Sequence, residues 1–274
     1  MPRIAILSDI HANLEAFNAV LNKCGQLDID LYVCLGDIVG YNANPVECLE
    51  MARSMTWTAM VRGNHDEYAN MNDDAVEGFN PNARAAILWT RAQLSDEERQ
   101  WVGTTPYKAT LPAYNMTLVH ATLDSPEQWG YIFDQHHSED NFTYQFTQVC
   151  FCGHSHVPVA FHKRPLSMMG QKQVEDLYDW VQLRDDDGML IPDDFAQERT
   201  FKPIRLQKGY KYLFNIGSIG QPRNRDPRSS FAVYDTDKQT VTRYLVPYDI
   251  ATAQEKVRAA GLPERLAQRL AIGA

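Results

Sequence analysis

The chain has 274 residues, of which 44% are hydrophobic, so it can build the core of one large α/β domain and is not intrinsically disordered. Its net charge of −9 argues against non-specific binding to nucleic acids or anionic membranes, although bound metals can reverse the sign locally around a phosphate substrate. Five cysteines without a Cys-x-x-Cys spacing, no apolar run of membrane-spanning length and no signal peptide favour a cytoplasmic protein with free thiols.

Three short apolar runs alternate with two helical patterns in the first 65 residues. The runs, typical of buried strands, cover residues 4–7, 31–35 and 57–61. Residues 13–24 carry apolar side chains at helical spacing before Gly25, and residues 45–51 begin with a proline suited to a first helical turn. This order predicts a parallel sheet with right-handed crossovers.

The rest of the chain has a different pattern. Residues 82–103 predict two helices, the second capped by Ser95 with Glu98 three residues later. Beyond Pro106, strands and turns predict a second sheet that is richer in hairpins. Its strands are expected over residues 116–119, 148–152, 157–162, 212–216, 231–234 and 241–246. Helices over 251–260 and 263–270 are predicted to follow.

Residues 166–206 fit no regular pattern. Residues 176–183 suit a helix, but the acidic turns at 185–188 and 192–194 interrupt the segment. We interpret it as a loop or lid inserted into a single domain that spans residues 1–274. A calcium site there is disfavoured because the full set of spaced ligands and the terminal glutamate of a calcium-binding loop are missing.

Polar side chains of metal-binding type follow directly on five of the strand-like runs. These side chains are Asp9, Asp37, Asn64, His120 and His154. Because ligands bind at the carboxyl ends of strands in α/β sheets, their repeated placement indicates one common site. Carboxylate, imidazole and amide oxygen suit divalent cations, and His11 and His156 extend the set. The sequence therefore predicts a centre for two metal ions.

Two neighbouring metals define a reaction. Asp37 is the natural bridging ligand, since its carboxylate can give one oxygen to each ion. Ions about 3.5–4 Å apart can share a hydroxide that attacks phosphorus in line, while they neutralise the charge on the phosphoryl oxygens. The leaving alkoxide then needs a proton, and His65 is the candidate donor because its neighbour Asn64 holds the ligand position.

These motifs carry a resemblance to a known family. The series Asp9-x-His11, Gly36-Asp37, Gly63-Asn64-His65-Asp66, His120 and Gly153-His154-x-His156 resembles the calcineurin-like metallophosphoesterases over nearly the whole chain. The resemblance implies an α/β fold, namely a two-sheet α/β/β/α sandwich, with His65 as the acid. It also implies one metal held by Asp9, His11, Asp37 and His156, and a second held by Asp37, Asn64, His120 and His154.

Other segments resemble a bacterial and archaeal branch of that family, whose members are phosphodiesterases or phosphatases. These segments are residues 9–16, 39–41, 215–223 and 260–266. One departure stands out: the family's protein phosphatases read Gly-Asp-x-x-Asp-Arg-Gly, whereas this chain has Gly40 in place of the second aspartate and lacks the arginine. This argues against a dedicated phosphoprotein phosphatase and leaves Asp66 as an alternative partner to orient His65.

Three residues are candidate substrate contacts: Asn13, Arg62 and Arg223. Arg223 lies in a basic cluster with Arg228 that fits either phosphate binding or pairing with Asp226 in a solvated turn.

We therefore predict a cytoplasmic, dimetal-dependent phosphoesterase that hydrolyses phosphodiesters or phosphomonoesters. Manganese is the expected metal, with iron, zinc, nickel or magnesium as alternatives. The expected partner is a small phosphoester or phosphorylated substrate, with no membrane and no strong nucleic-acid signal. Alternative functions are a dinucleoside polyphosphate hydrolase, a protein phosphatase and a catalytically inactive scaffold; the complete ligand set argues against the scaffold.

Overall fold

The computed structural model describes residues 1–72, 76, 79–168, 173–182 and 193–274. Its first sheet has the order β10-β13-β12-β1-β2-β3, with β9 paired to β13. The N-terminal half of this sheet is parallel, as predicted. It contains β1 (Arg3–Leu7), β2 (Leu31–Cys34) and β3 (Trp57–Met60), linked by α1 (Leu14–Cys24) and α2 (Pro45–Ser54).

The other half of the first sheet comes from late in the chain. It contains β9 (Arg199–Thr200), β10 (Ile204–Arg205), β12 (Ser229–Asp235) and β13 (Thr240–Val246). Strand β12 runs antiparallel to β1, with Ile4 opposite Tyr234. The assignment of residues 231–234 and 241–246 to the second sheet was therefore wrong. Strand β1 pairs with β2 on one edge, and its other edge needs a second strand as partner. The sequence pattern of β12 shows that it is a strand but does not reveal which sheet β12 joins.

The second sheet has the order β4-β5-β6-β11-β7-β8. Its strands are β4 (Lys108–Leu111), β5 (Met116–Val119), β6 (Val149–Cys152), β7 (Val159–Lys163), β8 (Val174–Asp176) and β11 (Lys211–Asn215). The pairs β4–β5 and β7–β8 are antiparallel, as a hairpin-rich sheet requires, whereas β5–β6 and β6–β11 are parallel. The predicted second sheet is thus confirmed for β5, β6, β7 and β11, whereas β4 and β8 were not predicted.

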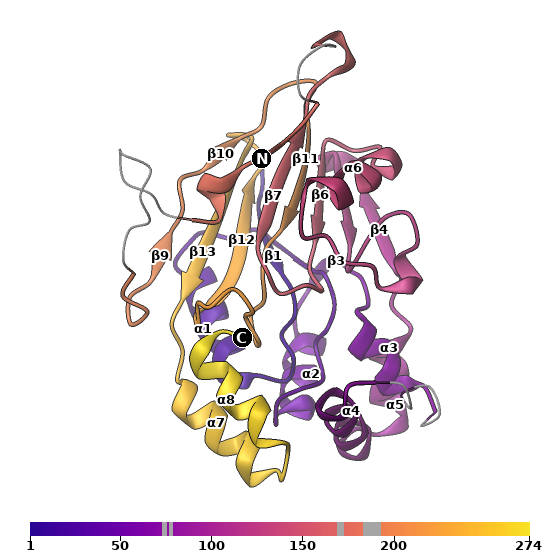
Figure 1. Ribbon diagram of the computed structural model, residues 1–274, viewed down its shortest axis with the longest axis vertical. Coiled ribbons are helices and arrows are strands. Elements are labelled where there is room, and N and C mark those ends of the chain that lie inside the picture. Colours follow the sequence, from indigo (N-terminus) through magenta and orange to yellow (C-terminus); the bar gives the residue numbers. More distant parts are fainter. Residues whose placement is uncertain (73–75, 77–78, 169–172, 183–192) are drawn as a thin grey trace.

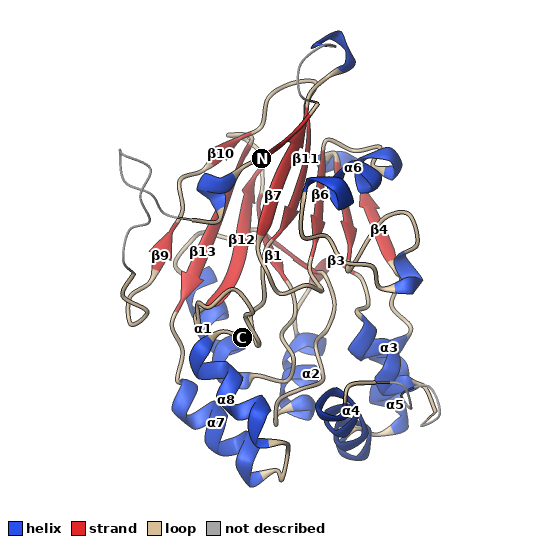
Figure 2. Cartoon of the chain, in the orientation of Figure 1, coloured by secondary structure: helices blue, strands red, loops and turns tan. Residues whose placement is uncertain are grey.

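The remaining long helices are α3 (Asn64–Asn70), α4 (Pro81–Gln93), α5 (Asp96–Gly103), α6 (Gln135–Tyr144), α7 (Ile250–Ala259) and α8 (Glu264–Ile272). The capping box of Ser95 and Glu98 begins α5, as predicted. In the view of Figure 2 the strands fill the upper half, α6 lies beside them and the other long helices lie below.

Three buried apolar layers hold the sandwich together. Ile6 and Val33 of the first sheet pack with Phe151 and Phe214 of the second, which forms the layer between the sheets. Helices α1 and α2 cover the outer face of the first sheet, and α6 contributes Phe142 to the outer face of the second. The chain folds as the predicted α/β/β/α sandwich. Its first sheet combines β1, β2 and β3 from the start of the chain with strands from the end of the chain (Figure 1).

The segment 166–206 is only partly described, and its acidic turn at 185–188 lies outside the described residues. Residues 176–182, the described part of the expected α-helix, do not form one: strand β8 ends at Asp176, and a 3₁₀ turn covers Tyr178–Trp180. Trp180 is fully buried between the sheets because its ring packs on Phe214, 5.1 Å between ring centroids. The described parts thus extend sheet edges, and a lid role stays a prediction.

Candidate metal centre

The loops after β1, β2, β3, β5 and β6 meet at one end of the two sheets. They bring Asp9, Asp37, Asn64, His120 and His154 to a common place, where ligands bind in α/β sheets. One ligand atom from each of Asp9, His11, Asp37 and His156 lies within 4.8 Å of the others, and so does one from each of Asp37, His120 and His154. The structure therefore brings together the carboxylates and imidazoles of the predicted ligand set.

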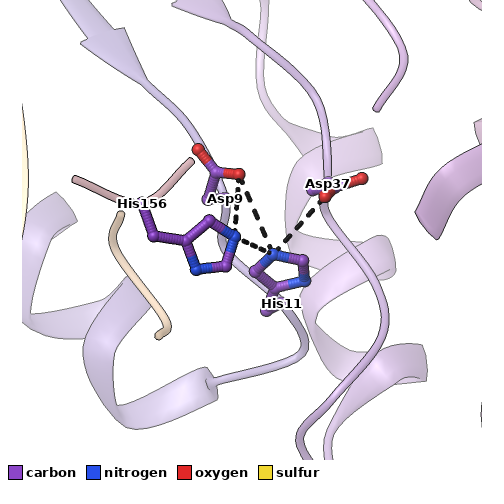
Figure 3. A group of neighbouring side chains, drawn as sticks. All are labelled: Asp9, His11, Asp37 and His156. Atoms are coloured by element: carbon purple, nitrogen blue, oxygen red, sulfur yellow. Dashed lines mark hydrogen bonds and ion pairs between the residues drawn. The ribbon is translucent and has the colours of Figure 1, made fainter. Parts of the chain in front are cut away.

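The first group is fully buried (Figure 3). His11 Nε2 lies 2.9 Å from His156 Nε2 and 3.4 Å from Asp37 Oδ2. His156 Nε2 lies 3.3 Å from Asp9 Oδ1. Two imidazoles and two carboxylates therefore converge on a space the size of a single cation.

The tautomers of this first group are set by backbone carbonyl groups. His11 Nδ1 lies 3.0 Å from the carbonyl oxygen of Val39, and His156 Nδ1 lies 2.6 Å from that of Gln221. A carbonyl only accepts, so each Nδ1 carries the hydrogen and each Nε2 presents a lone pair. The two lone pairs face each other across 2.9 Å, beside two carboxylates. Their repulsion is relieved by a cation between them, so these residues fit a metal.

The second group shares Asp37, whose Oδ2 also lies 3.3 Å from His120 Nε2. His120 Nδ1 donates to the carbonyl of Leu35 at 2.7 Å, which leaves Nε2 as the ligand atom. His154 has the opposite tautomer: its Nε2 donates to the carbonyl of Trp129 at 2.9 Å, which leaves Nδ1 for a metal. Asp37 Oδ2 therefore lies between the two groups, the position that a bridging ligand requires.

Three buried polar atoms of this second group have no hydrogen-bond partner among the described residues. They are Asp37 Oδ2, Asn64 Oδ1 and His120 Nε2. Asp37 Oδ2 and His120 Nε2 face each other at 3.3 Å as an ion pair, whereas nothing among the described residues faces Asn64 Oδ1 as a hydrogen-bond partner. A buried polar atom without a partner costs about 1–3 kcal/mol, and a cation bound by Asn64 would offset this cost.

Charges within the centre favour metal binding over protonation. Burial lowers the pKa of His154 to about 3 and holds the pKa of His11 and His156 well below the ordinary value. His120 differs: burial acts to lower its pKa, but the Asp37 carboxylate raises it to about 9. Although burial opposes it, the charges of His120 and His11 hold the pKa of Asp37 well below its usual range. At neutral pH burial thus leaves His11, His154 and His156 with free lone pairs, whereas His120 is protonated beside Asp37 until a metal displaces its proton.

Backbone strain gathers at the same residues. Asp9, His11, Asp37, His154 and His156 all have positive φ, between 49° and 67°. This left-handed conformation costs non-glycine residues about 1–3 kcal/mol and clusters at functional sites. Hydrogen bonds between the loops hold it, including those from the N–H of Asp9 to the carbonyl of Gly36 at 3.0 Å and from the N–H of His11 to that of Asp37 at 2.9 Å.

His65 lies in the first turn of α3, beside the ligands. Its backbone N–H donates to Asp37 Oδ1 at 2.8 Å, and its ring centroid lies 4.2 Å from Tyr41 and 4.9 Å from His11. Its Nδ1 is buried without a hydrogen-bond partner among the described residues. A Cβ atom on Gly40 would lie 2.5 Å from that nitrogen, so only glycine leaves room for the ring. Burial lowers the pKa of His65 to about 4.

Asp66 does not orient His65, which corrects the alternative drawn from the sequence. Its carboxylate accepts the backbone N–H groups of Asp37 at 2.7 Å, Ile38 at 2.9 Å and Gly63 at 3.1 Å. Consecutive side chains on a helix point in different directions, so Asp66 faces the loop while His65 faces the centre. Asp66 shapes the loop that presents Asp37.

Two expected substrate contacts have structural roles instead. Asn13 is the N-cap of α1: its Oδ1 accepts from the N–H of Ala16 at 3.1 Å, and its Nδ2 donates to the carbonyl of Gly220 at 2.9 Å. Arg62 donates to the carbonyl of Gly103 at 2.8 Å and stacks on Tyr107, 4.0 Å from the ring centroid. Both side chains are used by these contacts, so neither supports a substrate role.

The basic cluster separates into two environments. Arg223 lies at the mouth of the centre. Its guanidinium is 5.5 Å from the ring centroid of Tyr41, and its backbone N–H donates to the carbonyl of His156 at 3.2 Å. Its charge also contributes to the lowered pKa of His65. Arg228 is buried and pairs with Asp226 at 2.6 Å. Pairing was the right alternative for Arg228, although the pair is buried rather than solvated.

Two residues near the centre had no signal in the motifs. Trp129 supplies the carbonyl that orients His154, and Tyr131 stacks on the His154 ring with centroids 4.3 Å apart. Both lie in the loop after β5, between two ligand-bearing strands. The aromatic residues of that loop were the available clue.

Comparisons with known proteins agree with this geometry. Residues 2–158 match the family model described as calcineurin-like phosphoesterase. A metallophosphoesterase from Sphaerobacter thermophilus, known from a crystal structure, is 35% identical in sequence to this chain. Its structure superposes with a TM-score of 0.78, and the comparison covers 100% of this chain and 99% of that chain. An uncharacterized protein from Methanocaldococcus jannaschii is 34% identical over 272 residues, with 98% of each chain covered.

A hypothetical protein from Pyrococcus horikoshii shares the fold, with a TM-score of 0.75 at 19% identity and coverage of 100% of this chain and 99% of that chain. Within the described residues, no helix is both long and apolar enough to span a bilayer.

Proposed function

The chain belongs to the calcineurin-like phosphoesterase family, and on this premise we propose that it is a hydrolase that cleaves phosphodiesters or phosphomonoesters with two divalent metal ions. The observation that carries the proposal is the shared position of Asp37 Oδ2, 3.4 Å from His11 Nε2 and 3.3 Å from His120 Nε2. A carboxylate shared by two ligand groups suits a pair of cations. Oδ2 alone faces both groups, which differs from the expected arrangement of one oxygen for each ion.

We assign the ligands accordingly. Asp9, His11, Asp37 and His156 hold one ion; Asp37, Asn64, His120 and His154 hold the other. When bound, the two ions supply Lewis acidity that activates water and neutralises charge on the phosphoryl oxygens. The mixed set of carboxylate, amide and imidazole ligands suits first-row divalent metals, among which we propose manganese, with iron, zinc, nickel or magnesium as alternatives.

The remaining residues position the substrate and transfer a proton. Arg223 at the mouth of the centre can donate to the phosphoryl oxygens with its planar guanidinium. His65 gives a proton to the leaving oxygen, because its ring faces the centre without being needed as a ligand. Its lowered pKa means that the negative charge of a bound phosphate is required to favour the protonated form.

The leaving group tests this role of His65. We expect His65→Gln to slow alkyl phosphoesters, whose leaving oxygen must be protonated, by about 10²-fold or more. Nitrophenyl esters, which leave without a proton, should be slowed far less. The comparison is kcat/KM for both esters with added manganese. Equal losses on the two would remove His65 from the acid role.

The substrate class is decided by a panel. We expect a manganese-supplemented set of a phosphomonoester, a phosphodiester, a dinucleoside polyphosphate and a phosphopeptide to show the highest kcat/KM for one of the first two. Gly40 supports this ranking over the phosphopeptide, because a second aspartate cannot occupy its place against His65. A dominant phosphopeptide activity would overturn it.

All five cysteines are buried and unpaired, which supports a cytoplasmic location.

A further inference from the structure

A pocket lined by arginines opens beside the candidate metal centre, between α4 and α8. Its volume is about 320 Å³. The polar residues that line it are Tyr41, Asn80, Asn82, Arg223, Arg265 and Arg269. None of the described lining residues is acidic. We call this space the arginine pocket.

The arginine pocket gathers positive charges in a chain whose net charge is −9. Two exposed arginines elsewhere are paired with acidic side chains, Arg258 with Glu264 at 3.0 Å and Arg53 with Glu97 at 2.6 Å. Within the described part of the chain, no ion pair involves Arg223, Arg265 or Arg269.

The three charges are close enough to act on one another. Burial, together with the charges of Arg223 and Arg265, lowers the pKa of Arg269. Arg223 donates to the side chain of Gln221 at 2.9 Å, and Arg269 donates to the backbone oxygen of Ala274. Each guanidinium has five N–H donors, so both keep others for a ligand. Like charges gathered in one pocket favour an anion between them.

The start of α4 adds to this attraction. Asn80 is the N-cap of this helix of 13 residues, and its side chain accepts from the N–H of Asn82. The first turn of a helix carries a partial positive charge, and both of these residues line the pocket. The pocket therefore combines arginines, amide side chains and a helix N-terminus.

The arginine pocket adjoins the metal centre at two residues. Tyr41 lines the pocket, and its ring centroid also lies 4.7 Å from His11 and 4.2 Å from His65. Arg223 lines the pocket and extends over the same tyrosine. A molecule bound at the metals can thus reach the pocket with another part of its structure.

We propose that the arginine pocket is a subsite for a second phosphate group, so that the preferred substrates carry two phosphates joined by an organic linker. One phosphate lies at the metal centre and the other between α4 and α8. This inference rests on the proposed function for the first phosphate. Three arginines and a helix N-terminus exceed what a single carboxylate needs and match the charge and the several acceptor oxygens of a phosphate dianion.

The test compares alkanediol bisphosphates of three to eight carbons with the corresponding monophosphates. With manganese, kcat/KM should favour the bisphosphate over the monophosphate by at least about 10-fold at one linker length. Arg265→Gln, an exposed position that does not endanger folding, should remove about 10-fold of that preference, and Arg269→Gln a similar amount. The loss should fall selectively on the bisphosphate. Arg205→Gln, which removes the same charge from an exposed edge strand, should leave the preference intact.

Absence of a preference at every linker length would overturn the proposal, and so would equal losses on both substrates in Arg265→Gln. Calorimetric binding of hexanediol bisphosphate separates this inference from the proposed function. If the chain hydrolyses neither of these compounds nor bis(p-nitrophenyl) phosphate, the phosphoesterase proposal fails. Binding that is weakened by Arg265→Gln and not by Arg205→Gln still supports the pocket, and binding that is indifferent to both variants contradicts it.

Discussion

Two regions of the candidate site are built on opposite principles. The floor consists of the ligand residues Asp9, His11, Asp37, Asn64, His120, His154 and His156. Its imidazoles are buried and their tautomers are fixed by backbone carbonyls. The rim consists of Arg223, Arg265 and Arg269, which are partly or fully exposed. The contrast teaches that substitutions in the floor should remove the chemistry, whereas substitutions in the rim should change which substrates are used.

The largest effect is expected in the floor, from Asp37→Asn. The change keeps the size of the side chain but removes the negative charge that both ligand groups share. We expect kcat/KM for bis(p-nitrophenyl) phosphate with manganese to fall by roughly 10³-fold or more. Asp96→Asn, at an exposed position in α5, is the matched control and should retain full activity. Both variants should stay folded by circular dichroism; more than a tenth of wild-type activity in Asp37→Asn would break the contrast.

Gly40→Ala tests how the floor positions His65. The new Cβ would lie 2.5 Å from His65 Nδ1, so the ring must move. We expect kcat to fall by about 10²-fold while the metal content is unchanged.

Gly209→Ala is its control, because φ is +87° there and +91° at Gly40, but its nearest neighbour is Pro165 at 3.7 Å. Each variant should lose about 1–2 kcal/mol of stability from the left-handed backbone. Only Gly40→Ala should lose activity, and similar kinetics in the two variants would refute this positioning of His65.

Much of the floor could be predicted from the sequence because a simple rule applies. A strand in an α/β sheet presents its ligands at its carboxyl end, so Asp9, Asp37 and His120 were recognisable from the apolar runs before them. The same rule could not show that Asn13, expected as a substrate contact, is a helix cap. Helix caps and substrate contacts use the same residue types, and only the hydrogen bonds distinguish them.

The rim could not be predicted, for a different physical reason. Arg265 and Arg269 meet Arg223 only after α8 packs beside α4, and no local pattern encodes that contact. The role of the Trp129 carbonyl could not be predicted from the sequence either, because every residue has a backbone carbonyl. The sheet that receives β12 was mistaken because pairing partners depend on the free edge of β1, which is distant along the chain.

Metal binding by the floor should depend on pH through His120. His120 must lose a proton to bind a metal, and the Asp37 carboxylate raises its pKa to about 9. Below that pH a proton competes with the metal, so the affinity should fall by about tenfold for each unit of decrease. Calorimetry at pH 7.5 in buffers of different ionisation enthalpy should show release of roughly one proton per chain. Release of none would contradict the assignment of His120.

The smallest effect is expected at the rim, from Arg223→Gln. Its guanidinium lies over Tyr41 rather than among the metal ligands, so the change should weaken substrate binding more than chemistry. We expect KM for a phosphomonoester to rise by roughly tenfold with kcat within about threefold. Steady-state kinetics beside Arg205→Gln, which should match the wild type, would show this. A collapse of kcat instead would place Arg223 in the floor.

The central claim is that the floor holds two metal ions that drive phosphoester hydrolysis. Its most direct test is elemental analysis of the protein purified without chelator, together with hydrolysis of bis(p-nitrophenyl) phosphate before and after metal removal. We predict close to two transition-metal ions per chain, loss of hydrolysis on chelation and recovery when manganese is added. A chain that binds no metal, and whose activity does not increase with manganese, would contradict the account.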